Sequence, residues 1–355
     1  MKWDIKKLPS GEDFETRRIL KSLPTAYSVL SELKGMASTI PNQTILINTL
    51  GLREAKDSSA IENIITTDDE LFKSSLNLKS IKSVEAKEVQ NYVAALKRGF
   101  TLVLEQGLLT NRTIKEVQSM LEKNKAGFRR LPGTALKNSF TGEIIYTPPQ
   151  DINDIEILMA ELENYINDSE VDDYDPLVKM AIIHFQFESI HPFYNGNGRT
   201  GRIINILYLI LNKLIDLPIL YLSSYIIRNK SEYYRTLQEV RDGNEWEEWI
   251  LFLIDAIKVT SQETIEKIRS IKEQMQNMKT LLRENYKFYS QDLLNNLFSH
   301  PYTKIEFVVE DLNVTRLTAA NYLNRLSKDG VLRKEKLGVS NYYVNESLFR
   351  LLSEE

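Results

Sequence analysis

Apolar residues recur at three- and four-residue spacing along most of this chain of 355 residues, and this periodicity constrains its fold more than any other feature. Such spacing places the apolar side chains on one face of a helix. Proline and glycine, which interrupt helices, number only 10 and 14. The sequence therefore predicts a mainly α-helical protein with short connections. The periodic segments are 25–35, 83–106, 113–123, 155–168, 176–190, 200–214, 230–241 and 245–284.

One segment, 127–150, departs from this helical pattern. Its run Glu143–Tyr146 is β-type, and it lies between Thr141–Gly142 and Pro148–Pro149. Glycine favours a turn and proline ends a strand, so these neighbours bound a short strand. We expect a short β-hairpin within an otherwise all-helical core.

The composition changes after about residue 260. Residues 262–284 place an apolar stripe among charges, which predicts a connecting helix. A coiled-coil seam between two copies is the alternative, although about three heptads are few. Residues 290–350 then indicate three short helices and two β-type runs around Gly338, an order that resembles the winged helix-turn-helix, a small α+β domain. We expect four regions: an N-terminal helical region (1–110), a core (111–260), a connecting helix (261–288) and the winged-helix domain (289–355).

The third helix of the C-terminal domain carries polar residues that could reach a DNA major groove. Acidic residues nearby dilute the positive field, and small domains of this kind also bind proteins. DNA and protein partners therefore both stay open for this domain. The polar residues are Arg316, Asn321, Asn324, Arg325 and Lys328.

Composition excludes several functional classes. The chain has no cysteine, which removes disulfide frameworks, cysteine zinc sites, iron–sulfur clusters and thiol nucleophiles. A formal charge of −4 gives no overall attraction to nucleic acid or to an anionic membrane. The N-terminus has no apolar signal-peptide core, and no apolar stretch reaches the ~18 residues that cross a bilayer. We expect a cytoplasmic protein with no membrane partner.

The segment 184–211 concentrates the residues that suggest chemistry. An apolar helix ends at His191–Pro192, because proline lacks an amide donor and disfavours a helical residue before it. Three glycines follow within six positions, and such a cluster lets backbone amides approach a ligand closely. These glycines are Gly196, Gly198 and Gly201.

A second apolar helix begins near Thr200, directly after the glycine cluster. Free amides and the helix dipole at such a start favour an anion. Arg199 and Arg202 add two guanidinium groups suited to phosphate oxygens. Because His191 stands beside this site, the pattern suggests nucleotidyl or phosphoryl transfer. A tight structural corner with solvated charges is the alternative reading of the same residues.

Residues 191–202, HPFYNGNGRTGR, resemble the signature of the Fic family, HPFx(D/E)GNGRxxR, and match eight of its nine fixed positions. The segment ending Tyr146–Pro149 resembles the family's flap, which aligns a target peptide by strand pairing. The likeness extends over most of residues 1–255. It implies a helical Fic core with a hairpin flap, and a protein adenylyltransferase that transfers AMP from ATP to a Ser, Thr or Tyr hydroxyl of a protein.

The resemblance also implies roles for single residues. His191 would be the catalytic base that deprotonates the target hydroxyl, and Phe193 would anchor the loop. Tyr234 is a candidate to pack against adenine. The phosphates would be bound by Gly196, Asn197 and Gly198, with Arg199 and Arg202 on the β and γ phosphates.

Asn195 stands where the family places an acidic Mg²⁺ ligand. A neutral amide oxygen can coordinate a hard cation, but it lacks the charge of a carboxylate. We therefore expect Mg²⁺ to accompany ATP, with only a weak metal contact at Asn195.

A second motif lies upstream, where Ser58–Asn63 reads SSAIEN. It resembles the family's inhibitory signature, (S/T)xxxE(G/N), carried on an N-terminal helix, and Ser58, Glu62 and Asn63 match its fixed positions. The resemblance implies that Glu62 pairs with Arg202 and occupies the group needed by the γ-phosphate. We therefore expect self-inhibition.

Two other functions stay open. Glu62 could instead orient a water that removes AMP from a modified protein. Alternatively, the Fic part could only sense nucleotide within a DNA-binding regulator. The sequence does not reveal whether the target is another protein or the chain itself, which nucleotide is used, or whether the protein forms a homodimer.

Overall fold

The computed structural model describes residues 5–8, 10–74, 83–137, 141–168, 173–337 and 340–353. Helices dominate these ranges, which confirms the prediction from apolar periodicity. The helices of the N-terminal part are α1 (Arg17–Ser38), α2 (Thr44–Ile61), α3 (Asp68–Ser74), α4 (Val84–Gln106) and α5 (Asn111–Glu122). Those of the central part are α6 (Ile152–Asn167), α7 (Pro176–Ile190), α8 (Asn197–Leu211), α9 (Leu222–Arg228), α10 (Lys230–Gly243) and α11 (Trp246–Asn285).

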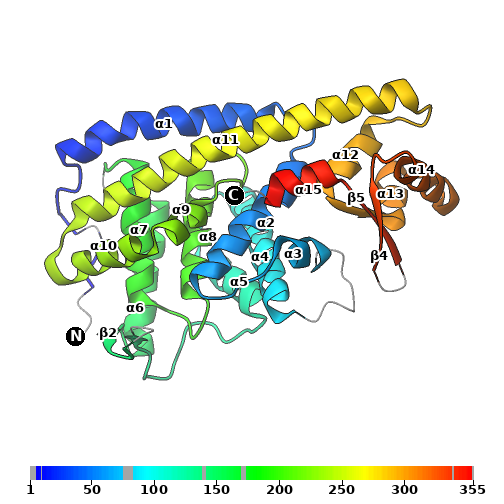
Figure 1. The fold of residues 1–355 in the computed structure, drawn as a ribbon. Helices are drawn as coiled ribbons and strands as arrows, with labels where there is room; N and C mark the ends of the chain where they lie inside the picture. The colour runs from blue at the N-terminus through cyan, green and yellow to red at the C-terminus, as the bar shows by residue number, and fades with distance from the viewer. Residues whose placement is uncertain are drawn as a thin grey trace.

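Helices α7 and α8 form the centre of the molecule (Figure 1). Every residue of α7 from Leu177 to Ile190 is buried, and so is almost all of α8. Helix α7 begins sharply because Asp175 accepts a hydrogen bond from the Leu177 amide and Pro176 occupies the first turn. Burial of an apolar side chain contributes about 1.5–3 kcal/mol, so these two helices fix the backbone between them.

Helix α11 is 40 residues long and runs along the molecule to the C-terminal domain, as Figure 1 shows. Helix α1 packs beside its first part. Its apolar residues include the stripe predicted for the connecting helix, with Ile265, Ile268 and Ile271 fully buried. The predicted boundary at residue 260 therefore falls inside one continuous helix, which links the core to the C-terminal domain.

The predicted β-hairpin is confirmed as the antiparallel pair β1 (Leu136–Lys137) and β2 (Ile144–Tyr146). Tyr146 faces the core, where its hydroxyl donates to the Ser189 carbonyl at 3.0 Å. Ile144 and Ile145 are 51% and 41% exposed. The hairpin is therefore anchored through one residue at the end of β2, while its other side chains reach solvent.

The C-terminal domain follows the predicted order of helices and hairpin. It comprises α12 (Gln291–Ser299), β3 (Tyr302–Lys304), α13 (Ile305–Leu312), α14 (Arg316–Lys328), β4 (Arg333–Leu337), β5 (Ser340–Val344) and α15 (Glu346–Ser353). The three strands form an antiparallel sheet in the order β3-β5-β4. Strand β3 and helix α15 were not predicted, and Gly338 of the predicted hairpin turn lies outside the described residues.

The C-terminal domain packs against the N-terminal helices α2 and α3. Tyr302 donates to Asp69 of α3 at 2.7 Å, and Lys73 of α3 pairs with Glu335 of β4 at 3.0 Å. The rings of Phe72 and Phe349 meet edge to face, with centroids 5.6 Å apart. Helix α2 therefore lies between the core and the C-terminal domain.

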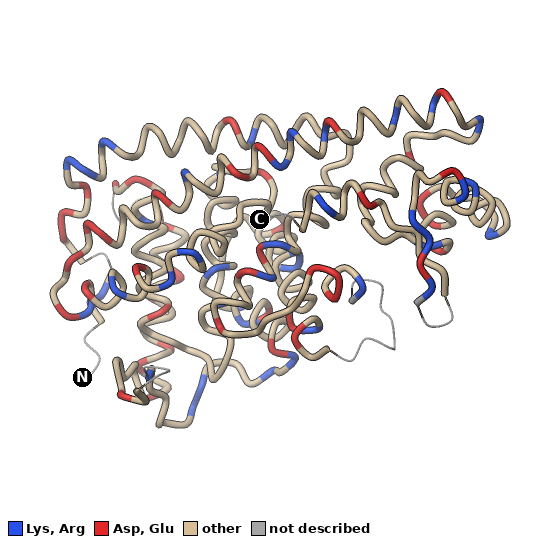
Figure 2. Tube along the Cα trace, in the orientation of Figure 1, with Lys and Arg blue, Asp and Glu red and all other residues tan. Residues whose placement is uncertain are grey.

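The polar residues predicted to face DNA lie on α14 or at its end. Two of them, Arg316 and Arg325, pair with Glu306 at 2.6 Å and Asp329 at 2.8 Å. Asn324 accepts hydrogen bonds from Lys334 and Tyr343, while Asn321 and Lys328 are exposed. Basic and acidic residues are interspersed along the whole trace (Figure 2).

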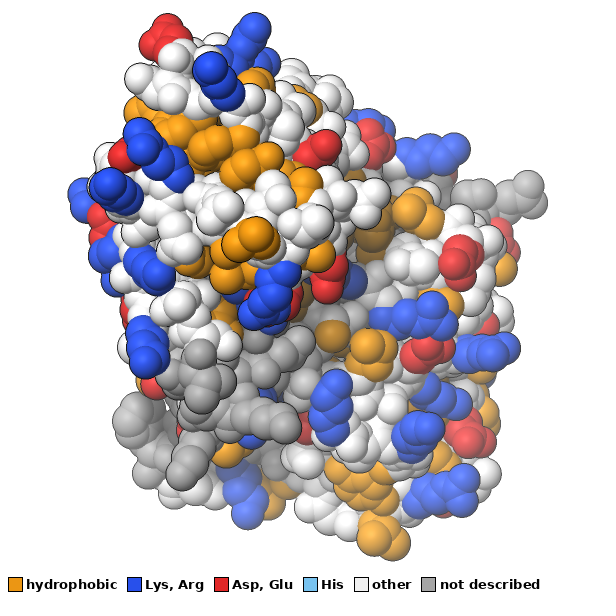
Figure 3. Space-filling model, turned by 90° about the vertical axis from the view of Figure 1, so that its right-hand side faces the viewer, with side chains coloured by type: hydrophobic (Ala, Val, Ile, Leu, Met, Phe, Trp, Pro, Cys, Tyr) orange, Lys and Arg blue, Asp and Glu red, His pale blue; other side chains and the backbone are white. Residues whose placement is uncertain are grey.

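The same domain also presents apolar surface. Leu317 of α14 is 72% exposed, and Figure 3 shows hydrophobic side chains gathered on the upper part of the face that carries this domain. No helix within the described ranges is both long enough and apolar enough to span a membrane.

Candidate active site

His191 lies at the C-terminal end of α7, where the helix stops. Its backbone is left-handed, with φ 48° and ψ 58°, and its amide donates to the Phe187 carbonyl at 3.0 Å. Pro192 cannot continue the helix, so the chain turns at this point. The turn presents the imidazole beside the glycine cluster that opens α8.

The loop after His191 is held by its own side chains. Phe193 is fully buried, with its ring 5.4 Å from that of Phe128. The Asn197 side chain accepts from the Phe193 amide and donates to the Phe193 carbonyl, both at 2.8 Å. The Tyr194 hydroxyl accepts from the Arg130 amide at 2.9 Å. The Asn197 side chain is therefore occupied in shaping the loop, and its backbone amide remains at the start of α8.

Gly196 and Gly198 lie where two carboxylates reach the loop. Gly196 has φ 74°, and a Cβ added to it would come 2.5 Å from Glu122 Oε1. A Cβ added to Gly198 would come 2.3 Å from Glu62 Oε1. The free amides and positive dipole end of α8 favour negative charge in this place. The geometry fits an anion-binding turn that two of the chain's own carboxylates approach.

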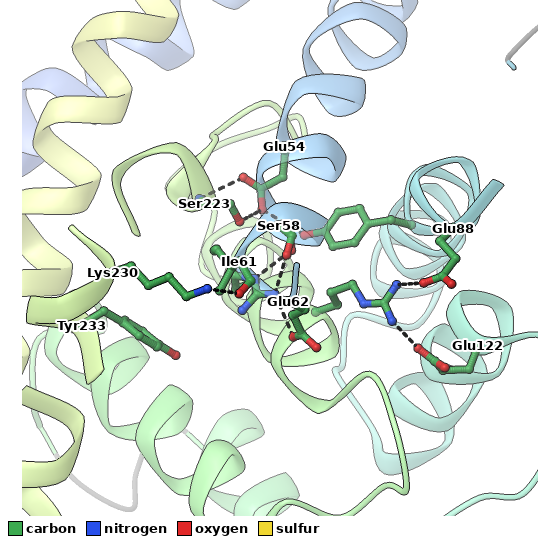
Figure 4. Close-up of polar contacts among 12 residues, drawn as sticks. Glu54, Ser58, Ile61, Glu62, Glu88, Glu122, Ser223, Lys230 and Tyr233 are labelled. Carbon is green, nitrogen blue, oxygen red and sulfur yellow. Dashed lines mark hydrogen bonds and ion pairs between the residues drawn. The ribbon is translucent and has the colours of Figure 1, made fainter. Parts of the chain in front are cut away.

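Arg202 is buried, and two of its three guanidinium nitrogens contact the end of α2, where Figure 4 labels Ser58 and Glu62. Its Nε donates to the Ser58 hydroxyl at 2.7 Å, and its Nη2 donates to the Ser58 carbonyl at 2.8 Å. The same Nη2 lies 3.1 Å from Glu62 Oε1. The structure thus brings together the two motifs that are 140 residues apart in the chain.

Arg199 contacts two other carboxylates, which the sequence analysis did not identify. Nη1 lies 3.0 Å from Glu88 of α4, and Nη2 lies 2.7 Å from Glu122 of α5 (Figure 4). Arg199 is only 5% exposed. Both terminal nitrogens of this guanidinium are therefore paired, and the pairs join the start of α8 to α4 and α5.

Helix α2 is fixed by further polar contacts around Glu62. The buried Glu54 carboxylate accepts from Tyr92 at 2.9 Å and from the Ser223 amide at 3.1 Å. Lys230 donates to the Ile61 carbonyl at 2.6 Å and so binds the last turn of α2. Asn63, with φ 64°, ends the motif in the left-handed region that Asn tolerates.

Burial is the main influence on His191, and it lowers the pKa of the imidazole to about 4. The charges of Arg129 and Arg241 lower this pKa further, whereas Glu62 acts in the opposite direction. The imidazole is therefore neutral near pH 7, which is the state that can accept a proton. His184, two turns earlier, is buried with Nε2 2.9 Å from the Tyr233 hydroxyl, and its ring stacks on Trp249.

Tyr234 and Asn195, which the resemblance places at the adenine and the metal, are both exposed. The Tyr234 ring is 48% exposed and meets Tyr233 edge-on, with centroids 5.2 Å apart. The charges of Arg202 and Glu62 both act on the pKa of its hydroxyl, in opposite directions. The Asn195 carbonyl accepts from Gln118 at 3.3 Å, which leaves the side chain on the surface of the loop.

The donor set at this loop fits a Mg²⁺ ion that arrives with a triphosphate. No group of three or more His, Asp or Glu able to hold an ion occurs within the described residues. Mg²⁺ often keeps waters and phosphate oxygens as most of its ligands. The Asn195 amide would add one neutral oxygen to such an ion.

Comparison with known families identifies three matching regions. The model described as Fic/DOC family N-terminal matches residues 20–101, and the model described as Fic/DOC family matches residues 108–209. A third, described as protein adenylyltransferase SoFic-like, C-terminal domain, matches residues 271–348.

Curated relatives match over shorter segments. The protein adenylyltransferase Fic of Drosophila mojavensis is 28% identical over 115 residues, which is 32% of this chain and 21% of the relative. A probable protein adenylyltransferase of Aquifex aeolicus is 33% identical over 86 residues, 24% of each chain. The chain spans about a fifth of the length of the first relatives that it matches.

Solved structures share the fold over longer ranges. A Fic family protein from Desulfovibrio desulfuricans G20 has a TM-score of 0.61 at 18% identity, covering 93% of this chain and 96% of that one. Fic-1 of C. elegans has a TM-score of 0.53 at 20% identity, covering 70% and 73%. With its N-terminal, central and C-terminal regions matched in order, this chain belongs to the Fic/DOC family.

Proposed function

We propose that this protein is a self-inhibited protein adenylyltransferase. A single observation carries the proposal: a glycine turn at the start of α8 has a neutral imidazole on one side and a buried guanidinium, engaged by the chain's own Glu62, on the other. The names of its relatives support the same activity, although this chain covers only part of each.

The reaction assigned to the site is transfer of AMP to a protein hydroxyl. His191 accepts the proton as the hydroxyl oxygen attacks the α-phosphorus of ATP. The new P–O bond forms as the bond to the β-phosphate breaks, and pyrophosphate leaves. The amides of the Gly196–Gly198 turn and the Arg202 guanidinium are suited to the negative charge of the phosphates. Mg²⁺ bound to the triphosphate neutralises part of that charge.

The hairpin β1–β2 is suited to hold the target. Its exposed Ile144 and Ile145 lie on a short strand next to the end of α7. An extended peptide can pair with such an edge through main-chain hydrogen bonds, which read little sequence. The target hydroxyl, whether on another protein or on a second copy of this chain, would then lie near His191.

Self-inhibition follows from the competition for Arg202. Three acceptors, the Ser58 hydroxyl, the Ser58 carbonyl and Glu62 Oε1, already occupy the guanidinium. A γ-phosphate needs the same group, and the Glu62 carboxylate at Gly198 repels it. Replacement of Glu62 removes one carboxylate charge and releases the Arg202 Nη2 donor from it. The two Ser58 contacts stay in place.

The test is incorporation of AMP by Glu62→Gly, measured as intact protein mass after incubation with Mg²⁺ and ATP, GTP, UTP or CTP. We expect at least tenfold more incorporation than in wild type, equivalent to about 1.4 kcal/mol, with ATP as the donor. Glu62→Gly combined with His191→Ala should show none, whereas His300→Gln, remote in the C-terminal domain, should behave as its parent. Equal labelling with and without His191 would refute the proposed base.

A reverse activity at the same site is separated by the same variant. If Glu62 orients a water that removes AMP, Glu62→Gly should lose release of AMP from a labelled protein while it gains transfer. An inhibitory role alone predicts gain of transfer with no release by wild type.

A further inference from the structure

We infer that Arg129 is the positioning residue of His191: it fixes the backbone at the end of α7 and, together with Arg241, places positive charge on the last carbonyl groups of that helix. The inference rests on the proposed role of His191 as the base. Arg129 lies in the segment between α5 and β1, outside the 191–202 motif.

Arg129 bonds to consecutive carbonyl groups on either side of the catalytic position. Its Nε donates to the His191 carbonyl at 2.8 Å, and its Nη2 lies 3.4 Å from the Ile190 carbonyl and also contacts that of Pro149. Its backbone amide donates to the Pro192 carbonyl at 2.9 Å. The residue is 1% exposed, so solvent cannot replace these bonds.

These bonds act where the backbone is least relaxed. His191 is left-handed at φ 48°, a conformation that a residue with a Cβ rarely adopts. Its amide is held by Phe187 and its carbonyl by Arg129, so both sides of the residue are fixed. Without Arg129, the carbonyl of His191 would lose its charged partner, and the direction of the imidazole would no longer be set.

Arg241 of α10 meets the same helix end from another side. Its guanidinium lies 4.1 Å from the centre of the Tyr146 ring, and its Nη2 lies 3.5 Å from the Glu188 carbonyl. Neither Arg129 nor Arg241 forms a salt bridge within the described part of the chain. The hydrogen bonds of Arg129 therefore go to carbonyl groups, while the charge of Arg241 also acts on the nearby Glu188 carboxylate.

The electrostatic consequence is specific to a base at this place. The C-terminus of a helix carries partial negative charge, which stabilises a protonated histidine. Two guanidinium groups, that of buried Arg129 and that of half-buried Arg241, oppose that effect. The charged groups that act on His191 are Arg129 and Arg241, which lower the pKa of the imidazole, and Glu62 at the end of α2, which raises it; the Glu188 carbonyl of α7 also raises it. The arginines thus keep the imidazole neutral and able to accept a proton.

The experiment titrates His191 directly. Full-length Glu62→Gly protein with ¹³C-labelled histidine is followed by NMR, with the three histidines assigned through His184→Gln, His191→Gln and His300→Gln. In Arg129→Met we expect the midpoint of the His191 titration to rise by at least one pH unit, and the acidic limb of the AMP-transfer profile to rise with it. Lys115→Met is the control, because Lys115 is a cation over the Phe128 ring near the loop and is not among the charges that act on His191. It should leave the midpoint unchanged.

Arg129→Lys separates charge from geometry and serves if the methionine variant does not fold. Lysine keeps the positive charge but lacks the several N–H donors of a guanidinium. The midpoint of the His191 titration should therefore stay low, while kcat falls at least tenfold with KM for ATP unchanged. A folded Arg129→Met whose His191 midpoint does not move, or an Arg129→Lys with unaltered kcat, would overturn the inference. The titration requires no turnover. A shifted His191 midpoint in a protein that transfers no AMP would therefore support the role of Arg129 and refute the proposed adenylyltransferase activity.

Discussion

Glu188 is a buried carboxyl near the proposed active site, and its ionisation lowers the stability of the folded protein. It lies one turn before His191, is 7% exposed, and its Oε1 has no hydrogen-bond partner in the described structure. Burial raises the pKa of its carboxyl to about 7, although Arg202 opposes this. Oε1 lies close to Gly201, where an added Cβ would come 2.6 Å from it.

The raised pKa of Glu188 predicts a pH-dependent stability. The unfolded carboxyl ionises near 4.5, so its contribution is complete below that pH and is lost as pH rises through about 7. Between pH 5.5 and 7 the loss is about 2 kcal/mol. Glu188→Gln cannot ionise, and we expect it to gain about that much stability over wild type between pH 5.5 and 8 in urea unfolding.

Glu54→Gln is the matched control for this prediction. The pKa of Glu54 is also raised to about 7 by burial, but its carboxylate accepts bonds from Ser223 and Tyr92. By the same linkage Glu54→Gln should also gain stability relative to wild type as pH rises. An amide offers one fewer acceptor oxygen to Ser223 and Tyr92, however, so this variant should be less stable than Glu188→Gln at each pH. If Glu188→Gln exceeded wild type in stability by the same amount at pH 5.5 and at pH 8, a raised pKa for Glu188 would be contradicted.

Among elements, the start of α8 is where α2, α4 and α5 converge. Each supplies a carboxylate: Glu62 for Arg202, and Glu88 and Glu122 for Arg199. These pairs are mostly buried on the arginine side, where an unpaired guanidinium is costly. The resemblance assigned Arg199 to phosphate, and its present partners make that assignment testable.

Removal of both partners of Arg199 should make the protein depend on nucleotide. In the Glu62→Gly background, we expect Glu88→Gln with Glu122→Gln to lower the free energy of unfolding by about 3 kcal/mol, because a buried charge loses its partners. If Arg199 then binds phosphate, ATP with Mg²⁺ should raise Tm more than in the parent.

The exposed pair Arg98–Glu116 supplies the control, since Glu116→Gln should cost less than about 1 kcal/mol. If the double variant is destabilised but ATP with Mg²⁺ raises its Tm no more than that of the parent, Arg199 serves only to join the helices.

At the scale of the whole molecule, the C-terminal domain packs against helix α2, whose end carries Glu62. It contacts α2 through α12 and α15, and it holds α3, which follows Glu62 by six residues, through Tyr302 and Glu335. Arg316 and Arg325, two of the residues predicted to face DNA, are exposed and pair with Glu306 and Asp329.

Weakening of this interface should relieve inhibition in part. Tyr302→Phe with Lys73→Met removes the two polar contacts to α3, worth about 1 kcal/mol each, so Glu62 is held less firmly. We expect AMP incorporation to rise about threefold, less than for Glu62→Gly. Arg350→Met, which removes an exposed contact within α15, should have no effect. A lower Tm without any gain of incorporation would show that the domain contributes stability alone.

Features that depend on neighbouring residues could be predicted from the sequence. Apolar periodicity predicted α1, α4 to α8, α10 and α11, but not α2, α3 or α9. Glycine and proline predicted the hairpin, and Pro192 predicted the end of α7. Resemblance to a family supplied the contact between Glu62 and Arg202, which no spacing rule could have given. Strand β3 and helix α15 were missed because they are short and owe their conformation to packing.

By itself, the sequence determined the helical class, the hairpin and the glycine turn after His191, because these depend on backbone preferences over a few residues. The tertiary structure alone decided that Glu88 and Glu122 reach Arg199 from 111 and 77 residues away. It likewise decided that Arg129 reaches the carbonyl of a residue 62 positions later. Such contacts form only when helices pack, and the charge of a buried group then depends on partners that no local pattern specifies.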